Sequence, residues 1–410
     1  MGIAGPYQQI LREPGAARFT AAAFIARLPI SMVGLGIVLM VSALRGSYGL
    51  AGAVAAAYTV SSALLNPLGS RAVDRWGQRR VVRLLVIVHV MGLLGLALAT
   101  VGGVHALGLL GRAVIAGATQ PATGALVRAR WAHALGGDRR LRTAFAFEGV
   151  LDEFIFVVGP PLATFLAVAV SAPAPVVASA ILVATGSLLL LLQRGTEPPA
   201  RGARPAEHGN PLGRVGVVSV LVVLLAIGGV FGSIDVATVA LADEAGQRLA
   251  AGAVLAAYAA GSMASALVLG ARSASGSDAR LPRVLLLAAG ALVLVTLPLL
   301  AKPGLLALGI LALLAGLAVS PVLITGFSLV EVLVEPREIT EGLSWAISAI
   351  GLGVAASAAA TGWWVDRAGA HAGFTITLGC AATVAVVALA GHGRVRRGVS
   401  ARSAAPSDNV

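Results

Sequence analysis

Residues 69–80 read GSRAVDRWGQRR, a polar and basic stretch set between two apolar runs at 49–69 and 81–102. Each run is close to the roughly 20 residues that an α-helix needs to cross a bilayer. Inside the stretch, Asp74 stands among arginines, and Gly77 suits a tight turn. Arginine and lysine collect in the cytoplasmic loops of membrane proteins. The stretch therefore predicts a cytoplasmic turn between two membrane-spanning helices.

Apolar runs of similar length recur along all 410 residues. The chain is 58% apolar and 12% charged, whereas soluble domains have about 45–50% and about 25%. This composition excludes an ordinary soluble enzyme, and the lack of alternating polarity excludes a β-barrel. The 51 glycines suit closely packed membrane helices. We expect an all-α membrane protein with twelve transmembrane helices, at 19–44, 49–69, 81–102, 104–127, 143–170, 174–193, 215–240, 249–270, 283–301, 304–330, 342–362 and 372–391.

The basic residues orient these spans. With both termini in the cytoplasm, most of the 30 Lys and Arg residues fall on the cytoplasmic side. The other side holds only Arg45, Arg248, Lys302 and Arg367, while Arg27 and Arg112 lie inside spans. The net charge of +12 thus reflects membrane orientation. We expect a multi-pass protein of the plasma membrane that binds no nucleic acid.

The widest polar break divides the spans into six and six. We predict an N-terminal six-helix half at 1–192, a cytoplasmic linker at 193–214, a C-terminal six-helix half at 215–391 and a basic, disordered tail at 392–410. Halves of equal span number indicate a duplicated unit. We expect a monomer.

The stretch at 69–80 resembles the loop signature that the major facilitator superfamily carries between its second and third spans. Asp74, Arg75, Gly77, Arg79 and Arg80 match this signature. The resemblance implies two halves around a central cavity, which transport small molecules by rocking to expose the cavity to each side in turn. It also implies that the matching residues form a conformational latch between the halves.

Span 5 carries three carboxylates, Glu148, Asp152 and Glu153. Asp152 and Glu153 lie about 15 Å from the start of the span, near the midplane. Carboxylates at this depth are costly and face the interior of the helix bundle. We interpret Asp152 and Glu153 as a proton-coupling pair, with Glu148 relaying protons or meeting a cationic substrate. The alternative is an ion pair that only holds helices together.

Two arginines inside spans require partners. Arg27 in span 1 and Arg112 in span 4 stay charged at any physiological pH. We expect them to pair with Asp152 or Glu153, because a buried guanidinium needs a carboxylate or carbonyl. The alternative, which suits Arg112 better than Arg27, is that the side chain extends to the lipid headgroups.

Other polar residues have two open interpretations. Gln120 in span 4 either lines the cavity as a substrate-binding group or packs in the core. Asp235 in span 7 either lines the cavity or ends the helix at the water. Residues 362–369, GWWVDRAG, are expected to form an interface belt and turn on the outer side, and Trp76 and Trp131 to mark the inner headgroup level.

Sequence signs of catalysis and of cofactor binding are missing. No Gly-rich loop precedes a Lys-Ser or Lys-Thr pair, so there is no nucleotide-binding P-loop. The single cysteine, Cys380, allows no intrachain disulfide and no cysteine-based metal site. We expect no enzyme activity, no metal and no cofactor.

The direction of transport is indicated by a second resemblance. Gly159-Pro160 is similar to an element in the fifth span of proton-driven drug exporters. This resemblance implies a twelve-span drug:proton antiporter that exports small amphipathic organic molecules. Two alternatives stay open: a proton symporter or facilitator that imports a small nutrient, and a membrane enzyme or receptor that transports nothing.

Overall fold

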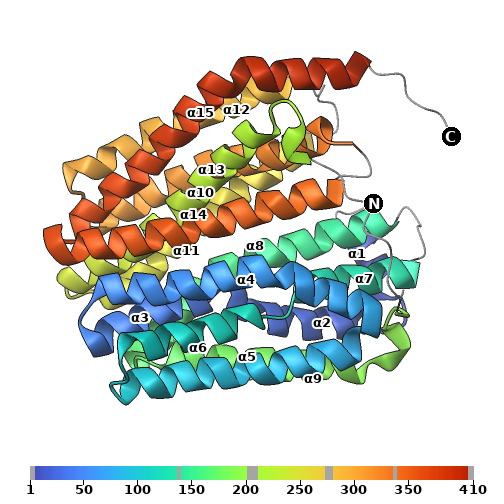
Figure 1. Cartoon of the computed structure of the whole chain (residues 1–410), viewed down its shortest axis with the longest axis horizontal. Helices are drawn as coiled ribbons and strands as arrows, with labels where there is room; N and C mark the ends of the chain where they lie inside the picture. The colour runs from blue at the N-terminus through green and yellow to red at the C-terminus, as the bar shows by residue number, and fades with distance from the viewer. Residues whose placement is uncertain (1–4, 136–139, 201–210, 273–279, 336–338, 405–410) are drawn as a thin grey trace. The chain divides into compact units, whose positions relative to one another are not determined.

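The computed structural model describes residues 5–135, 140–200, 211–272, 280–335 and 339–404. Over these ranges the chain consists of helices and short connections, with no strand (Figure 1). Eleven of the described helical segments are long and apolar enough to cross a membrane. The expected all-α membrane fold is therefore confirmed.

The span expected at 104–127 is not one continuous helix. It is divided into α6 (Ala106–Ala118) and α7 (Thr123–Leu135). Pro121 lies in the break, where it lacks a backbone N–H and disfavours helical geometry at Gln120. The expected end of this span, at residue 127, is wrong as well, because α7 continues to Leu135. With α6 and α7 taken as one broken span, the described helices agree with twelve crossings.

Residue packing divides the chain into two compact units. Unit 1 comprises Met1–Gly46 and Ala57–Pro205, and unit 2 comprises Ser47–Ala56 and Ala206–Val410. The first turns of the helix α4 (Tyr48–Trp76) therefore belong to unit 2, and the remainder of this helix belongs to unit 1.

Unit 1 is held together by helices from both of its ends. The α2 helix packs against α9, and α5 packs against α6 and α9. Pro29 interrupts the first span, which consists of α2, the 3-10 helix η1 and α3. Phe19 and Trp131 meet edge to face in the buried core, with ring centroids 4.8 Å apart. Besides α4, α6 and α7, the elements are α1 (Gly5–Leu11), α2 (Ala16–Arg27), η1 (Leu28–Ser31), α3 (Val33–Arg45), α5 (Gln78–Val101), α8 (Arg140–Ala169), α9 (Ala174–Leu192) and η2 (Arg194–Thr196).

Unit 2 is built on close contacts between glycine-rich helices. The α10 helix packs against α14 and α15, and α11 packs against α13. A Cβ atom at Gly353 on α14 would overlap the carbonyl of Leu225 on α10, so glycine allows this close approach. Its elements are η3 (Pro211–Gly213), α10 (Val217–Glu244), α11 (Arg248–Arg272), α12 (Leu281–Thr296), η6 (Leu297–Ala301), α13 (Leu305–Leu333), α14 (Ile339–Ala368) and α15 (Ala370–Ala404).

Candidate functional site

A buried ion pair joins the first and fifth spans inside unit 1. Arg27 is the last residue of α2, and its Nη2 donates to Glu148 Oε2 on α8. Both side chains have no solvent exposure. Arg27 Nε also donates to the carbonyl of Ala23, at 3.3 Å. The guanidinium is thus fixed by its own helix on one side and by α8 on the other.

Glu148 is fully occupied by donors. Besides Arg27, it accepts hydrogen bonds from Trp131 Nε1 at 2.7 Å and from Thr20 Oγ1 at 3.4 Å. The expectation that Trp131 marks the headgroup level is wrong, because this side chain is fully buried. Three donors from the two helices α2 and α7 therefore hold this carboxylate in place. This geometry makes Glu148 a fixed anchor for Arg27.

Asp152 lies one turn further along α8 and has two cationic partners. Its Oδ1 accepts from Arg27 Nη1 and its Oδ2 from Arg128 Nη2, each at 2.7 Å. Unlike the anchor pair, Asp152 and Arg128 are partly accessible, at 33% and 38% of their side-chain surface. Asp152 therefore bridges a buried arginine and an accessible one. We call Arg27, Arg128, Glu148 and Asp152 the charge cluster.

Glu153 follows the charge cluster in sequence but has no cation of its own. It is half-buried, and no hydrogen bond or ion pair joins it to any other described residue. The charge cluster alone balances two arginines with two carboxylates. An ionised Glu153 would add a negative charge without compensation in the membrane interior, which is costly. Among the three carboxylates of span 5, Glu153 alone therefore has no cationic partner in the described part of the chain.

Two other expected site residues lie outside the charge cluster. Arg112 donates from Nη1 to the carbonyl of Gly108 on its own helix, at 2.9 Å. The expectation that it pairs with a span 5 carboxylate is not met among the described residues. Gln120 lies at the break between α6 and α7, where its Oε1 accepts from Ser62 Oγ at 2.5 Å.

The sequence missed Arg128 as a partner of Asp152, and it missed Trp131 as a partner of Glu148. Both residues were assigned to a loop or to the headgroup level because span 4 was expected to end at 127. They lie instead on α7, three residues apart, which places them on one face of the helix. This three-residue spacing is the feature of the sequence that could have indicated that Arg128 and Trp131 lie on the same side of one helix.

The signature loop forms the expected turn. Helix α4 ends at Trp76, Gly77 adopts a φ of 86°, and α5 begins at Gln78. Glu197 Oε1 accepts a 2.9 Å hydrogen bond from the backbone N–H of Arg79, in the first turn of α5. The fully buried Arg130 of α7 holds the segment around Glu197 as well, because it donates to Thr196 Oγ1 at 2.7 Å. This turn is therefore tied to the segment that follows α9.

A cavity of about 330 Å³ opens beside this turn within unit 1. Its lining includes Asn66, Asp74 and Gln78 from α4 and α5, Arg128 from α7, and the pair Pro198-Pro199. The volume is within the range of about 300–1,000 Å³ that ligand pockets have. Because Arg128 both lines the cavity and contacts Asp152, the cavity reaches the charge cluster.

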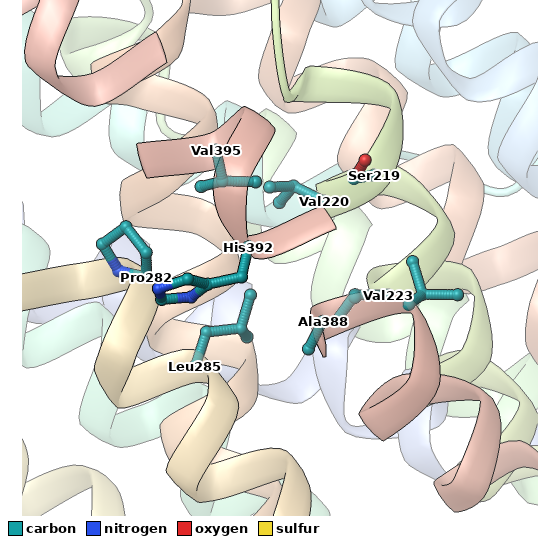
Figure 2. Close-up of a pocket in the computed structure, with 9 residues that line it drawn as sticks. Ser219, Val220, Val223, Pro282, Leu285, Ala388, His392 and Val395 are labelled. Carbon is teal, nitrogen blue, oxygen red and sulfur yellow. The ribbon is translucent and has the colours of Figure 1, made fainter. Parts of the chain in front are cut away.

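Unit 2 has a much smaller pocket near the start of α12. Figure 2 shows the ring of His392 beside Pro282 and Leu285 in its wall. Its volume of about 10 Å³ corresponds to a single water molecule. It is too small for an organic substrate.

The GWWVDRAG segment at 362–369 forms a second turn of the same design. The two turns share the pattern Asp-Arg-x-Gly, and Gly369, like Gly77, has a positive φ, of 80°. Glu244 Oε1 accepts from the backbone N–H of Ala370 at 2.7 Å, as Glu197 accepts at the first turn. Trp363 and Trp364 are partly exposed and stack with centroids 5.6 Å apart. The sequence predicted the turn, but not its bonding.

Asp235 lies inside the helix α10, which continues to Glu244. The interpretation that Asp235 ends its helix at the water is therefore wrong. The carboxylate is half-buried. Separately, no group of three or more His, Cys, Asp and Glu side chains in the described part of the chain is arranged to hold a metal ion.

Solved structures with a similar fold cover nearly the whole chain. The nucleoside transporter NupG is 16% identical with a TM-score of 0.67, covering 95% of this chain and 99% of its own. A bacterial homolog to the human lysosomal transporter Spinster is 12% identical with a TM-score of 0.70, covering 97% and 99%. The human organic anion transporter MFSD10 is 17% identical with a TM-score of 0.59, covering 92% and 100%.

Sequence comparison gives the family. No curated protein matches the chain. The family model described as Major Facilitator Superfamily matches residues 19–275, which is more than half of the chain. The chain belongs to the Major Facilitator Superfamily, whose members are membrane carriers of small molecules.

Proposed function

We propose that this chain is a proton-coupled transporter that exports small amphipathic organic molecules. It lies in the plasma membrane with both termini in the cytoplasm, and the halves at 1–192 and 215–391 rock about the linker at 193–214. The charge cluster carries the proposal. Asp152 is shared between a fixed and an accessible arginine, and Glu153 beside it has no cation of its own.

The arrangement supplies a way to exchange protons. The proton affinity of a carboxylate depends on the distance of its cationic partner. Glu148 fixes Arg27, whereas Arg128 is partly exposed and lines the cavity. Movement of Arg128 away from Asp152 changes the electric field at both Asp152 and Glu153. A conformational change that moves α7 against α8 would therefore load or release a proton.

The energy available suffices for concentrative transport. One proton moving down 100 mV releases about 2.3 kcal/mol. One pH unit adds about 1.4 kcal/mol. Together they sustain a concentration ratio of several hundredfold for one substrate per proton.

The export direction and the drug:proton antiporter type are supported by the Gly159-Pro160 element. In the structure Gly159 packs against Ser31 of η1, so this element brings α8 close to the interrupted first span. The similar solved structures include nucleoside, peptide and organic anion transporters. Since that fold serves several cargoes, the substrate class is proposed from this chain's own residues.

The test is gradient-driven uptake in everted vesicles. We expect Glu153→Gln to abolish uptake driven by an imposed pH gradient and to leave gradient-free substrate exchange intact. Glu331→Gln is the matched control, because Glu331 is exposed near the end of α13. Unchanged driven uptake in Glu153→Gln would remove Glu153 as the coupling group, and uptake confined to right-side-out vesicles would contradict export.

A further inference from the structure

Asp235 is a carboxylate in the membrane interior without a counter-charge. It lies nine residues before the end of α10 at Glu244, which is about 14 Å of helix rise. The helices that pack against α10 are α11, α13, α14 and α15. Neither α10, nor the central turns of α11, α13 and α14, nor residues 372–391 of α15 contain a lysine, arginine or histidine, and His371 lies in the first turn of α15. Within the described part of the chain, Asp235 makes no hydrogen bond and no ion pair. It differs in this from Asp152, which has two arginines.

Two aromatic side chains lie next to this carboxylate. Phe231 precedes Asp235 by one helical turn and meets Tyr258 of α11 edge to face, with ring centroids 5.8 Å apart. Tyr258 is also close enough to Asp235 to interact with it electrostatically. Its hydroxyl is buried and has no hydrogen-bond partner among the described residues. A carboxyl group and two aromatic rings thus lie together, and neither the carboxyl group nor the Tyr258 hydroxyl has a hydrogen-bond partner among the described residues.

This combination of groups has a matching ligand chemistry. An uncompensated carboxylate in a membrane span binds a proton or a cation. Aromatic faces attract cations, and the attraction grows when water is excluded. A metal ion would need several oxygen ligands, whereas Asp235 supplies the only carboxylate on α10 before the helix end. An organic cation needs one carboxylate and apolar walls.

We infer that Asp235, Phe231 and Tyr258 form a binding site for a lipophilic organic cation within unit 2. The inference rests on the proposed transport function and specifies its substrate class. It gives Asp235 a role separate from Glu153: Asp235 holds the cargo, while Glu153 couples its movement to protons.

The experiment is binding of tetraphenylphosphonium to the purified full-length protein in detergent, measured by equilibrium dialysis. We expect saturable binding to the wild type and at least tenfold weaker binding to Asp235→Asn. Asp235→Glu keeps the charge and should bind within about threefold of the wild type. Phe231→Ala should weaken binding several-fold, and Tyr258→Phe, which keeps the ring, should not. Gel filtration establishes that each variant is folded.

A second measurement needs no variant. Dicyclohexylcarbodiimide modifies carboxyl groups in apolar surroundings, and mass spectrometry reports modification at Asp235. We expect tetraphenylphosphonium to slow this modification in the wild type. Absence of saturable binding, equal binding by Asp235→Asn, or no protection at Asp235 would each overturn the inference. Because these readouts require no gradient, they are separate from the uptake test of Glu153.

Discussion

Asp366 accepts a 2.8 Å hydrogen bond from the backbone N–H of Gly49, although 317 residues separate the two in the chain. Its other oxygen accepts from the N–H of Tyr48, also at 2.8 Å, and Ser47 Oγ donates to the same carboxylate. The first N–H groups of a helix have no partner within the helix, and its N-terminus attracts negative charge. Asp366, at the end of α14, therefore caps α4 from outside.

Loss of this cap should destabilise the protein. We expect Asp366→Ala to cost about 0.5–2 kcal/mol, the usual effect of removing a helix cap, and Asp366→Asn to cost less because it keeps one acceptor. Thermal unfolding of the purified protein measures the difference. Asp74→Ala is the matched control, since Asp74 has the same place in the other turn and accepts no hydrogen bond among the described residues. Equal losses in both variants would contradict the capping role.

The anchor pair predicts a non-additive double mutant. Arg27→Met leaves Glu148 buried and charged with only Trp131 and Thr20 as donors, so we expect a loss of about 3–5 kcal/mol. Arg27→Met combined with Glu148→Gln removes both charges and should be more stable than Arg27→Met alone. Folded yield and thermal unfolding of the three variants give the comparison. Strictly additive losses would mean that the two side chains do not interact.

The two arginines near span 4 should differ in their effect on transport. Arg128 contacts Asp152 and lines the cavity, whereas Arg112 bonds only to its own helix among the described residues. We expect Arg128→Ala to lower driven uptake at least tenfold and Arg112→Ala to change it less than twofold. Both variants lose one positive charge, so each controls for the other. Equal uptake in the two variants would remove Arg128 from the coupling mechanism.

The sequence predicted features that depend on local patterns. Hydropathy located the spans, and the turn at Gly77 followed from a glycine among polar residues. The pairing of Asp152 with Arg27 also followed, because a carboxylate placed inside a span needs a cationic partner. The prediction that span 4 ends at residue 127 was wrong. Because α7 extends to Leu135, Arg128 reaches the charge cluster from a place that hydropathy assigns to the loop.

Contacts between segments that are far apart in the sequence could not be predicted either. Nothing near Asp366 in the sequence indicates that Ser47 and Gly49 bond to it, because the pairing depends on how α14 packs on α4. Likewise, the lack of a counter-charge at Asp235 becomes visible only when its neighbouring helices are known. Hydropathy predicts which segments cross the membrane, and packing then determines which side chains meet.

The signature loop gives a prediction that hydrogen exchange can test at one residue. Glu197 caps α5 through the N–H of Arg79, so Glu197→Ala should free that N–H and speed its exchange with deuterium. Glu197→Gln keeps an oxygen acceptor and should exchange at a rate between those of Glu197→Ala and the wild type. Glu244→Ala is the matched control, because Glu244 caps Ala370 at the other turn. That variant should speed exchange at Ala370 and leave Arg79 unchanged. If Glu197→Ala exchanged at Arg79 as slowly as the wild type, the segment after α9 would not hold the loop.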